Sequence, residues 1–221
     1  MKKLKIFLGD LSYINKENRF NLFVPLNIGY IASYSKKCFG EQVEITLFKD
    51  PNKLLAAIKS ERPDVLGLSF SYWNTKLNHV VSRKAKEILD NSLLVVWGGP
   101  SVDTDADQQL GLFRRFPFVD AFVTNEGELG FANLIEKRLS ENSKEMWSDP
   151  IDGIVHLYKG SLFQGFNIGL SLDLSTLDSP YLTGILDPFL GGDFLPMLQT
   201  SRLCPYTCLL YTSDAADEED S

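Results

Sequence analysis

Short apolar runs alternate with amphipathic stretches along the first 140 residues of the chain. The run LKIFLG at 4–9 is apolar on both faces of an extended strand, which is typical of a strand buried in a parallel sheet. Between the runs, apolar residues recur at helical spacing. This alternation predicts five strands, each followed by a helix, at 4–9, 43–49, 64–70, 93–99 and 121–125.

Residues that cap helices set the expected boundaries. Gly40 is suited to end the first helix, because glycine readily adopts the left-handed conformation found there. Asp50 or Asn52 can cap the second helix, and Pro63 marks its end. Asn74 is expected to cap the third helix. The inward face expected for that helix consists of Leu77, Val80, Val81, Ile88 and Leu89.

Strands that alternate with helices imply an α/β fold in which helices cover both faces of a parallel sheet. Right-handed crossovers and a domain of this size favour a flavodoxin-like (Rossmann-like) five-stranded parallel sheet in the order 2-1-3-4-5. Ligands of such folds bind beyond the carboxyl ends of the strands. The loops expected to carry the site are 10–26, 69–74, 98–104 and 125–128.

The pattern changes after the fifth helix. Residues 152–165 alternate around Lys159-Gly160 and predict a β-hairpin. Residues 166–192 are rich in Gly, Pro, Ser and Asp and are expected to form a connector, and 194–200 predict one more strand. The expected division of the chain is a domain at 1–140, a hairpin and connector at 141–193, the start of a further domain at 194–208 and a tail at 209–221.

The composition is that of an ordinary globular protein, with 44% hydrophobic and 23% charged residues. The net charge is -7, but residues 209–221 hold five acids and no Lys or Arg, so the rest of the chain carries only -2. There is no basic patch, and nucleic acid is therefore not an expected partner. The apolar runs are far shorter than the ~20 residues of a membrane helix, and the N-terminus lacks a signal-peptide pattern. We expect a cytoplasmic protein without a disulfide framework, since two of its three cysteines are only four residues apart.

Small residues gather where the third and fourth predicted strands end. Gly98-Gly99 closes the fourth strand, where glycine serves either a tight turn or the close approach of a ligand. Ser69 and Ser71 close the third strand at the same end of the sheet, although a lone hydroxyl there more often bonds nearby backbone. The two pairs together indicate a site more strongly than either does alone.

Two acids follow the fifth predicted strand. Glu126 and Glu128 lie in the expected first turn of a helix, where the helix dipole stabilises anions. Helix capping alone would explain the two acids, but it would not explain Gly127 between them.

These segments resemble the cobalamin-binding domain of radical S-adenosylmethionine (SAM) enzymes. Ser69-Phe70-Ser71 followed by Gly98-Gly99 is similar to the S-x-L…G-G portion of the cobalamin-binding signature, with Ser71 where the family often has Leu. TNEGELGFANLI at 124–135 is similar to the family's G-E-G-E segment, and PLNIGYIA at 25–32 to the start of its first helix. The resemblance implies that the nucleotide tail of cobalamin enters a slot beside the sheet, where the serine bonds it and the glycines leave room. A bulky residue at Gly99 is then expected to block the slot and leave the fold largely intact.

One feature of many cobalamin domains is absent. The family often carries D-x-H-x-x-G after the first strand, and its histidine ligates cobalt. Here the region reads GDLSYINKENRF, with Asp10 but no histidine. The two histidines of the chain, His79 and His156, fall in the third helix and the hairpin and are expected to be structural. The radical SAM group commonly lacks the ligand histidine too, so the resemblance implies cobalamin without a protein histidine on cobalt.

The stretch TSRLCPYTC at 200–208 resembles the opening of the C-x3-C-x2-C loop that holds a four-iron four-sulfur cluster in this family. Cys204 and Cys208 would be the first two ligands, and thiolates suit iron. Tyr211 stands where the third cysteine is expected. The acidic stretch 209–221 resembles a translated sequencing-adapter read-through, so we expect a truncated enzyme with a foreign, disordered tail.

The resemblance implies the cobalamin-binding part of a cobalamin-dependent radical SAM enzyme, such as a methyltransferase. The intact enzyme would cleave SAM at its iron-sulfur cluster, whereas this chain alone is expected to bind cobalamin without catalysis. Two alternatives stay open: a non-catalytic flavodoxin-like ligand-binding module, and a cobalamin domain that has lost its cofactor and acts as a scaffold. A receiver domain is disfavoured because SFSYWN at 69–74 holds no Asp, and no G-x-G-x-x-G is present.

The expected cofactor-binding residues lie at the ends of the first, third, fourth and fifth strands. Tyr72 and Trp73 are expected to be partly exposed there, near the corrin ring or the barrel that follows; the alternative is that both rings fill the core. The full set is Asp10, Ser69, Ser71, Tyr72, Trp73, Asn74, Gly98, Gly99, Pro100, Ser101, Asn125, Glu126, Gly127 and Glu128, with Cys204 and Cys208 as metal ligands.

Overall fold

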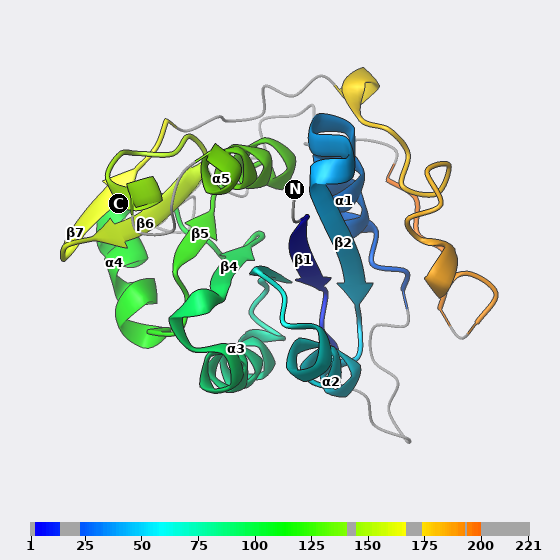
Figure 1. Ribbon diagram of the computed structural model, residues 1–221, viewed down its shortest axis with the longest axis horizontal. Coiled ribbons are helices and arrows are strands. Elements are labelled where there is room, and N and C mark those ends of the chain that lie inside the picture. The colour runs from blue at the N-terminus through cyan, green and yellow to red at the C-terminus, as the bar shows by residue number, and fades with distance from the viewer. Residues whose placement is uncertain (1–2, 14–22, 141–144, 167–173, 193, 200–221) are drawn as a thin grey trace, which may run out of the picture.

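A mixed β-sheet forms the centre of the described part of the chain (Figure 1). The computed structural model describes residues 3–13, 23–140, 145–166, 174–192 and 194–199. Within these residues the sheet has seven strands in the order β2-β1-β3-β4-β5-β6-β7. The first five are parallel, so the predicted order of those five strands is confirmed. The strands are β1 (Leu4–Gly9), β2 (Val43–Phe48), β3 (Val65–Ser69), β4 (Leu94–Gly98), β5 (Ala121–Val123), β6 (Ile154–Tyr158) and β7 (Ser161–Gln164).

The predicted hairpin forms, and it extends this sheet. Lys159 and Gly160 make its turn, and both have a positive φ, 48° and 83°, as a type I′ turn requires. β6 pairs antiparallel with β5 over the three residues from Ile154 to His156. The sheet is therefore two strands wider than the five-stranded sheet that was predicted, because the outer side of β5 pairs with the hairpin.

Helices cover both faces of the sheet. In the described residues α1 and α5 lie on one face, and α2, α3 and α4 lie on the other (Figure 1). Asp50 caps α2, since its Oδ1 accepts hydrogen bonds from the backbone N–H groups of Asn52 and Lys53. None of the described helices combines the length and apolar content needed to cross a bilayer. The helices are α1 (Leu26–Phe39), α2 (Pro51–Glu61), α3 (Thr75–Leu89), α4 (Ala106–Arg115) and α5 (Gly127–Ser140).

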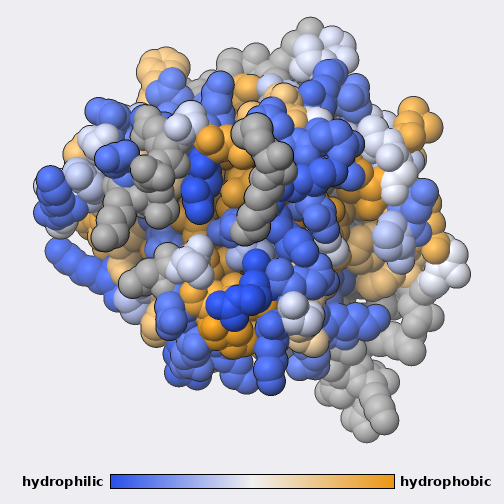
Figure 2. Space-filling view, viewed as in Figure 1, coloured by the Kyte–Doolittle hydropathy of each residue, from blue (hydrophilic) through white to orange (hydrophobic). Residues whose placement is uncertain are grey.

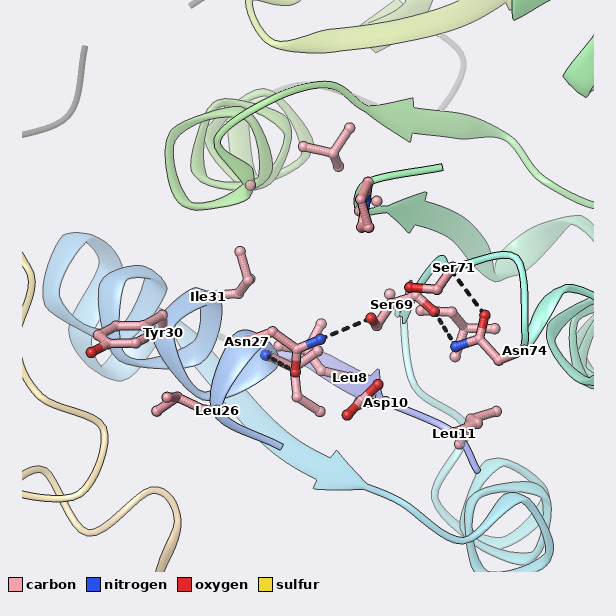
Figure 3. Close-up of a pocket in the computed structure, with 18 of the residues that line it drawn as sticks. Leu8, Asp10, Leu11, Leu26, Asn27, Tyr30, Ile31, Ser69, Ser71 and Asn74 are labelled. Carbon is pink, nitrogen blue, oxygen red and sulfur yellow. Dashed lines mark hydrogen bonds between the residues drawn. The ribbon is translucent and has the colours of Figure 1, made fainter. Parts of the chain in front are cut away.

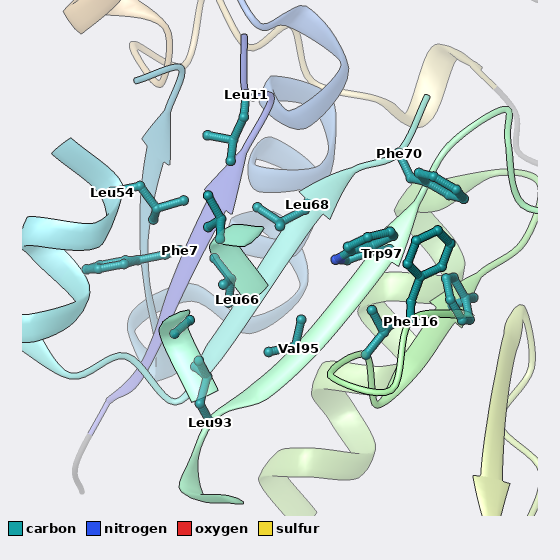
Figure 4. Close-up of a cluster of buried hydrophobic side chains, with 14 of the residues drawn as sticks. Phe7, Leu11, Leu54, Leu66, Leu68, Phe70, Leu93, Val95, Trp97 and Phe116 are labelled. Carbon is teal, nitrogen blue, oxygen red and sulfur yellow. The ribbon is translucent and has the colours of Figure 1, made fainter. Parts of the chain in front are cut away.

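The pleat of the strands sends alternate side chains into two apolar cores. Phe7, Leu66 and Trp97 point toward α2, α3 and α4, whereas their neighbours along the strands point toward α1 and α5. Figure 4 shows Trp97 beside Phe70 and Phe116, with ring centroids 5.0 and 4.8 Å from the indole. These cores hold the strand ends in register, which fixes the positions of the loops that leave them.

One position on α3 was predicted wrongly. Val81 is buried as expected, but Val80 has 38% of its surface exposed. Asn78 and Ser82 occupy the buried face instead. Asn78 bonds the backbone at the end of β3, and Ser82 accepts a hydrogen bond of 3.0 Å from the indole of Trp97. Because these polar groups need partners in the sheet, they take the inward positions and Val80 turns outward.

Residues 174–192 lie against the outer side of α1 (Figure 1). Leu186 and Phe189 form a small apolar core with Val24 and Leu26. Other apolar residues of this segment are exposed; Leu182, for example, has 91% of its surface exposed. Figure 2 shows apolar surface on the right side of the molecule, where this segment lies. The connector is thus packed on one side only.

The strand predicted at 194–200 does not form in the described residues. Leu195 makes a single parallel bridge to Phe23, and its carbonyl accepts a hydrogen bond from the backbone N–H of Val24. The hydroxyl of Tyr181 donates to the carbonyl of Met197 at 2.7 Å and accepts from its N–H at 3.1 Å. These contacts tie the segment to Val24 and Tyr181, but a single bridge is not a strand pairing.

Candidate functional site

A large cavity opens at the carboxyl ends of β1, β3, β4 and β5 (Figure 3). Its volume is about 1570 Å³, whereas clefts for small molecules usually measure about 300–1,000 Å³. The loops that line it are those at which ligands of doubly wound sheets bind. The cavity can therefore hold a ligand larger than a mononucleotide.

The inner part of the cavity is an apolar slot between the sheet and the helices α1 and α5. Gly67 lies at its base, where an added Cβ would come within 2.6 Å of a methyl group of Leu8 and 3.4 Å of the ring of Phe131. Because this glycine lacks a Cβ, Leu8 and Phe131 can pack close to β3 at the inner end of the slot. Its walls are Leu8, Ile31, Val96, Val123 and Phe131.

Ser69 lies at the end of β3 within a network of asparagine side chains. The amide nitrogen of Asn27 donates to Ser69 Oγ at 2.8 Å, as Figure 3 shows. The amide nitrogens of Asn74 and Asn78 each donate to the Ser69 carbonyl at 2.9 Å. Both the side chain and the backbone of Ser69 are therefore held in place from neighbouring helices.

Asn74 precedes α3, as predicted, but its side chain does not cap the helix. Its Oδ1 instead accepts from the N–H of Ser71 at 3.0 Å, and its Nδ2 reaches back to Ser69 (Figure 3). The side chain is almost fully buried, at 1% exposure. It closes the turn after β3 and thereby fixes the serines at the cavity.

The two adjacent glycines at the end of β4 have different surroundings. A Cβ added at Gly98 would meet the side chain of Val123 at 3.0 Å, on the slot side of the sheet. A Cβ added at Gly99 would come within 2.5 Å of the carbonyl oxygen of Phe70, and Gly99 has a φ of 141°. The expectation that a bulky residue at Gly99 leaves the fold intact is therefore wrong, because it would collide with backbone. Gly98 is the glycine that faces the slot.

The segment 125–128 brings two buried carboxylates to the cavity. Asn125 adopts a left-handed conformation with a φ of 53°, and it turns the chain from β5 into α5. Glu126 precedes the helix and Glu128 lies in its first turn; their exposures are 6% and 4%. A Cβ at Gly127 would meet the end of the Ile31 side chain at 2.7 Å, so the glycine between the acids lets α5 approach α1.

Asp10 lies at the end of β1 and also lines the cavity. Its Oδ2 accepts a hydrogen bond of 2.9 Å from the ammonium group of Lys49, which is only 3% exposed. A buried ammonium group needs such a partner, because removing one member of the pair leaves an uncompensated charge. Asp10 therefore has a structural role in joining β1 to the end of β2.

Aromatic and aliphatic side chains form the rim of the cavity. Tyr72 and Trp73 are 81% and 55% exposed, in agreement with the expectation that they are accessible at the strand ends. Their rings meet edge to face, with centroids 5.0 Å apart. The other exposed apolar side chains on the rim are Tyr13, Phe23, Met197 and Leu198.

The structure brings nearly all the predicted cofactor-binding residues together. Thirteen of the fourteen line the cavity, and Ser101 does not. Whether they contact a ligand stays a prediction. Sequence reasoning missed several lining residues that carry the geometry, namely Asn27, Gly67, Tyr13, Phe23, Tyr30, Met197, Leu198 and Gln199. Asn27 lies within the PLNIGYIA stretch, which was noticed only as a helix start.

Neither of the two histidines lines the cavity. His156 is fully buried between the rings of Trp147 and Phe163, and within the described residues neither ring nitrogen has a partner in good hydrogen-bond geometry. Burial lowers the pKa of His156 below its usual 6.5. His79 packs against Phe116 and Phe118. Both histidines therefore serve the packing of the fold.

Cys204 and Cys208, the predicted metal ligands, lie outside the described residues. Within the described ranges, no three His, Cys, Asp or Glu side chains are grouped so that they could hold a metal ion. Cys38 is exposed near the end of α1, and partial loss of water around its thiol raises the pKa of that group. The thiolate form, which binds metals, is thereby disfavoured at Cys38.

Two bacterial enzymes are similar to this chain over most of its length. TokK of Streptomyces tokunonensis, a cobalamin-dependent radical SAM methyltransferase, is 30% identical over 198 residues. The 2-(S-pantetheinyl)-carbapenam-3-carboxylate methyltransferase of Streptantibioticus cattleyicolor is 29% identical over 198 residues. Each alignment covers 84% of this chain but 28% of the relative, so the chain spans little more than a quarter of the length of these relatives.

More distant similarities extend to an archaeal protein and a solved structure. The uncharacterized methyltransferase PH0819 of Pyrococcus horikoshii is 27% identical over 196 residues, which cover 86% of this chain and 40% of the relative. A cobalamin-binding protein from Desulfitobacterium hafniense is 20% identical, with a TM-score of 0.42 over 62% of this chain and 59% of that protein. No known protein-family model matches the sequence. The family resemblance noted in the sequence is confirmed by these relatives: over most of its own length the chain is homologous to TokK, a cobalamin-dependent radical SAM methyltransferase, and to a second methyltransferase.

Proposed function

We propose that this chain binds cobalamin in the cavity at the carboxyl end of its sheet. The proposal rests on the way in which separate segments of the chain meet at one cavity. Segments after four different strands, three of which resemble the cobalamin-binding domain in sequence, line one cavity of about 1570 Å³. Homology to cobalamin-dependent enzymes supports the same ligand.

The shape of the cavity fits the two parts of cobalamin. The apolar slot beside Gly67 and Gly98 suits the flat, apolar base of the nucleotide tail, and Ser69 offers a hydroxyl beside it. The wider outer part suits the corrin ring. Primary amides surround that ring, and the buried carboxylates of Glu126 and Glu128 can accept hydrogen bonds from them because each carboxylate has several acceptor sites.

The face of the corrin next to the protein would meet the turn after β3. The side chains of Tyr72 and Trp73 are exposed at that turn, and both line the cavity. Aromatic rings can cover the lower side of the corrin without donating a ligand to the metal. Since both histidines lie outside the cavity lining, we infer that cobalt carries no histidine of this chain.

We further propose that the chain serves as the cobalamin-holding part of a radical SAM enzyme and is not catalytic alone. An iron-sulfur cluster with SAM would supply the radical chemistry, and methylcobalamin a methyl group. Cys204 and Cys208 would contribute thiolates to that cluster. Homology to two methyltransferases makes methyl transfer the reaction we favour.

The test is cofactor uptake by the purified chain. The protein is incubated with hydroxocobalamin and desalted, and its visible absorbance is measured. We expect about one equivalent to stay bound, because the cavity surrounds a large part of the ligand. A colourless protein would reject the proposal. Parallel incubations with flavin mononucleotide test the rival reading of a flavodoxin-like module, which predicts retained flavin and no retained cobalamin.

A further inference from the structure

We propose that Asn27 fixes the hydroxyl of Ser69 as a hydrogen-bond donor to the bound ligand. The ligand atom at this position must then be an acceptor, such as an unprotonated ring nitrogen or an oxygen. This inference rests on the proposed function, since it concerns the same cavity. It adds a positioning residue that acts through Ser69 and that the sequence did not single out.

The orientation of the Asn27 amide follows from its two partners. Its Oδ1 accepts a hydrogen bond of 2.8 Å from the backbone N–H of Ile28. A backbone N–H can only donate, so the oxygen must lie on that side of the amide. The NH₂ group therefore faces Ser69, and it donates to Ser69 Oγ at 2.8 Å (Figure 3).

Because Asn27 donates to Ser69 Oγ, the Ser69 hydroxyl can act toward a ligand as a hydrogen-bond donor. Its oxygen already accepts from Asn27, and among the described residues no second partner of this hydroxyl is found. A hydroxyl has a single proton, which is then available to a ligand in the cavity. The backbone of Ser69 cannot shift to change this arrangement easily, because Asn74 and Asn78 both hold its carbonyl.

If the ligand presented a hydrogen-bond donor at this point, it would face the O–H donor of Ser69. Two donors cannot bond each other, so both would be buried without an acceptor. An unsatisfied buried group weakens binding, typically by tenfold or more. Asn27 thus selects the chemistry of the ligand without needing to touch it. Its position in the first turn of α1, at the mouth of the slot, allows this indirect action.

The substitution Asn27→Asp tests this polarity. The carboxylate has nearly the same shape but can only accept, so Ser69 would donate to it and present lone pairs to the ligand. We expect cobalamin to bind about tenfold or more weakly. Cobinamide, which lacks the nucleotide tail, should bind as it does to the unaltered protein. Asn52→Asp is the matched control, because it adds the same charge to the first turn of α2 and lies outside the cavity lining.

A second variant separates polarity from charge. In a Ser69→Ala background there is no hydroxyl to redirect, so Asn27→Asp should no longer weaken cobalamin binding. An equal loss in both backgrounds, or an equal loss for cobalamin and cobinamide, would overturn the role of Asn27. If the unaltered protein binds cobalamin and Asn27→Asp binds it equally well, only this inference fails. If the unaltered protein binds no cobalamin, the proposed function fails and this inference fails with it.

Discussion

At the scale of single residues, the two glycines after β4 allow a direct comparison. We predict that Gly98→Val narrows the slot and reduces cobalamin affinity at least tenfold with a smaller loss of stability than Gly99→Ala, since valine suits a strand and the added Cβ would meet backbone only at 3.6 Å, although the Val123 side chain at 3.0 Å must shift. Gly99→Ala should instead lower the free energy of unfolding by about 1–3 kcal/mol, because of its positive φ and the Phe70 carbonyl. Chemical denaturation and cofactor titration of both variants measure the contrast. Equal stability losses would contradict it.

The buried histidine predicts a pH dependence of stability. Burial lowers the pKa of His156 in the folded state, while the unfolded chain keeps a value near 6.5. The unfolded state therefore takes up a proton first, and stability is full above pH 6.5 and falls as the pH drops below it, by at most about 1.4 kcal/mol per pH unit. His156→Phe should remove this contribution. The measurement is the unfolding free energy of both proteins from pH 7.5 to 5, and parallel curves would show that His156 is not responsible.

Much of the site could be predicted from residue types at strand ends. Ser69 and Gly98 are the last residues of buried strands, Glu126 follows another, and the carboxyl ends of parallel strands meet at one edge of a sheet. Asn27 could not be found in this way, because its role depends on which atoms of a distant strand its amide reaches. Gly67 was equally hidden, since a glycine inside an apolar run gives no sign of the side chains that pack against it.

At the scale of elements, the turn between β3 and α3 depends on Asn74. If this residue acted as a helix cap, Asn74→Ser would be tolerated, because serine is a good cap. The structure instead uses its amide to close the turn, so we expect both Asn74→Ser and Asn74→Ala to lower the unfolding free energy by about 1–3 kcal/mol. Asp105→Ser is the control, since Asp105 does cap α4. A serine tolerated at position 74 would restore the capping role.

The helices and parallel strands were predictable because burial and periodicity act locally. The failures concern contacts between distant segments. The hairpin was predicted as a unit, but its pairing with β5 depends on an open strand edge that sequence does not display. The strand at 194–200 has the right composition, yet in the described residues only Leu195 finds a strand partner. Val80 turned outward because Asn78 required a partner in the sheet.

At the scale of the whole molecule, cysteine positions limit metal binding. Cys204 and Cys208 would provide two thiolates, whereas the four-iron cluster proposed for the intact enzyme would need three. Cys38, the third cysteine of the chain, lies on α1 twelve residues beyond Leu26 at the cavity, or about 18 Å along the helix. We predict that anaerobic reconstitution with iron and sulfide gives no stable four-iron cluster, as judged by iron content and broad visible absorbance. A stoichiometric cluster would contradict this and would require a thiolate from Cys38 or from another chain.

The pairing of β6 with β5 also decides where a shortened chain can end. A chain that stops at Ser140 would keep the strand-end loops of the cavity after β1, β3, β4 and β5. It would leave the outer N–H and C=O groups of β5 without the partners that Ile154, Val155 and His156 provide. Such an open edge is a template for pairing with other molecules. We expect the chain that ends at Ser140 to aggregate as its concentration rises, as measured by light scattering. A chain that ends at Phe166 should keep the same particle size at all concentrations. Equal behaviour of the two would show that β5 tolerates an open edge. If only the shorter chain aggregates, the unit that folds on its own extends beyond residue 140, and the hairpin is the part of it that prevents self-association.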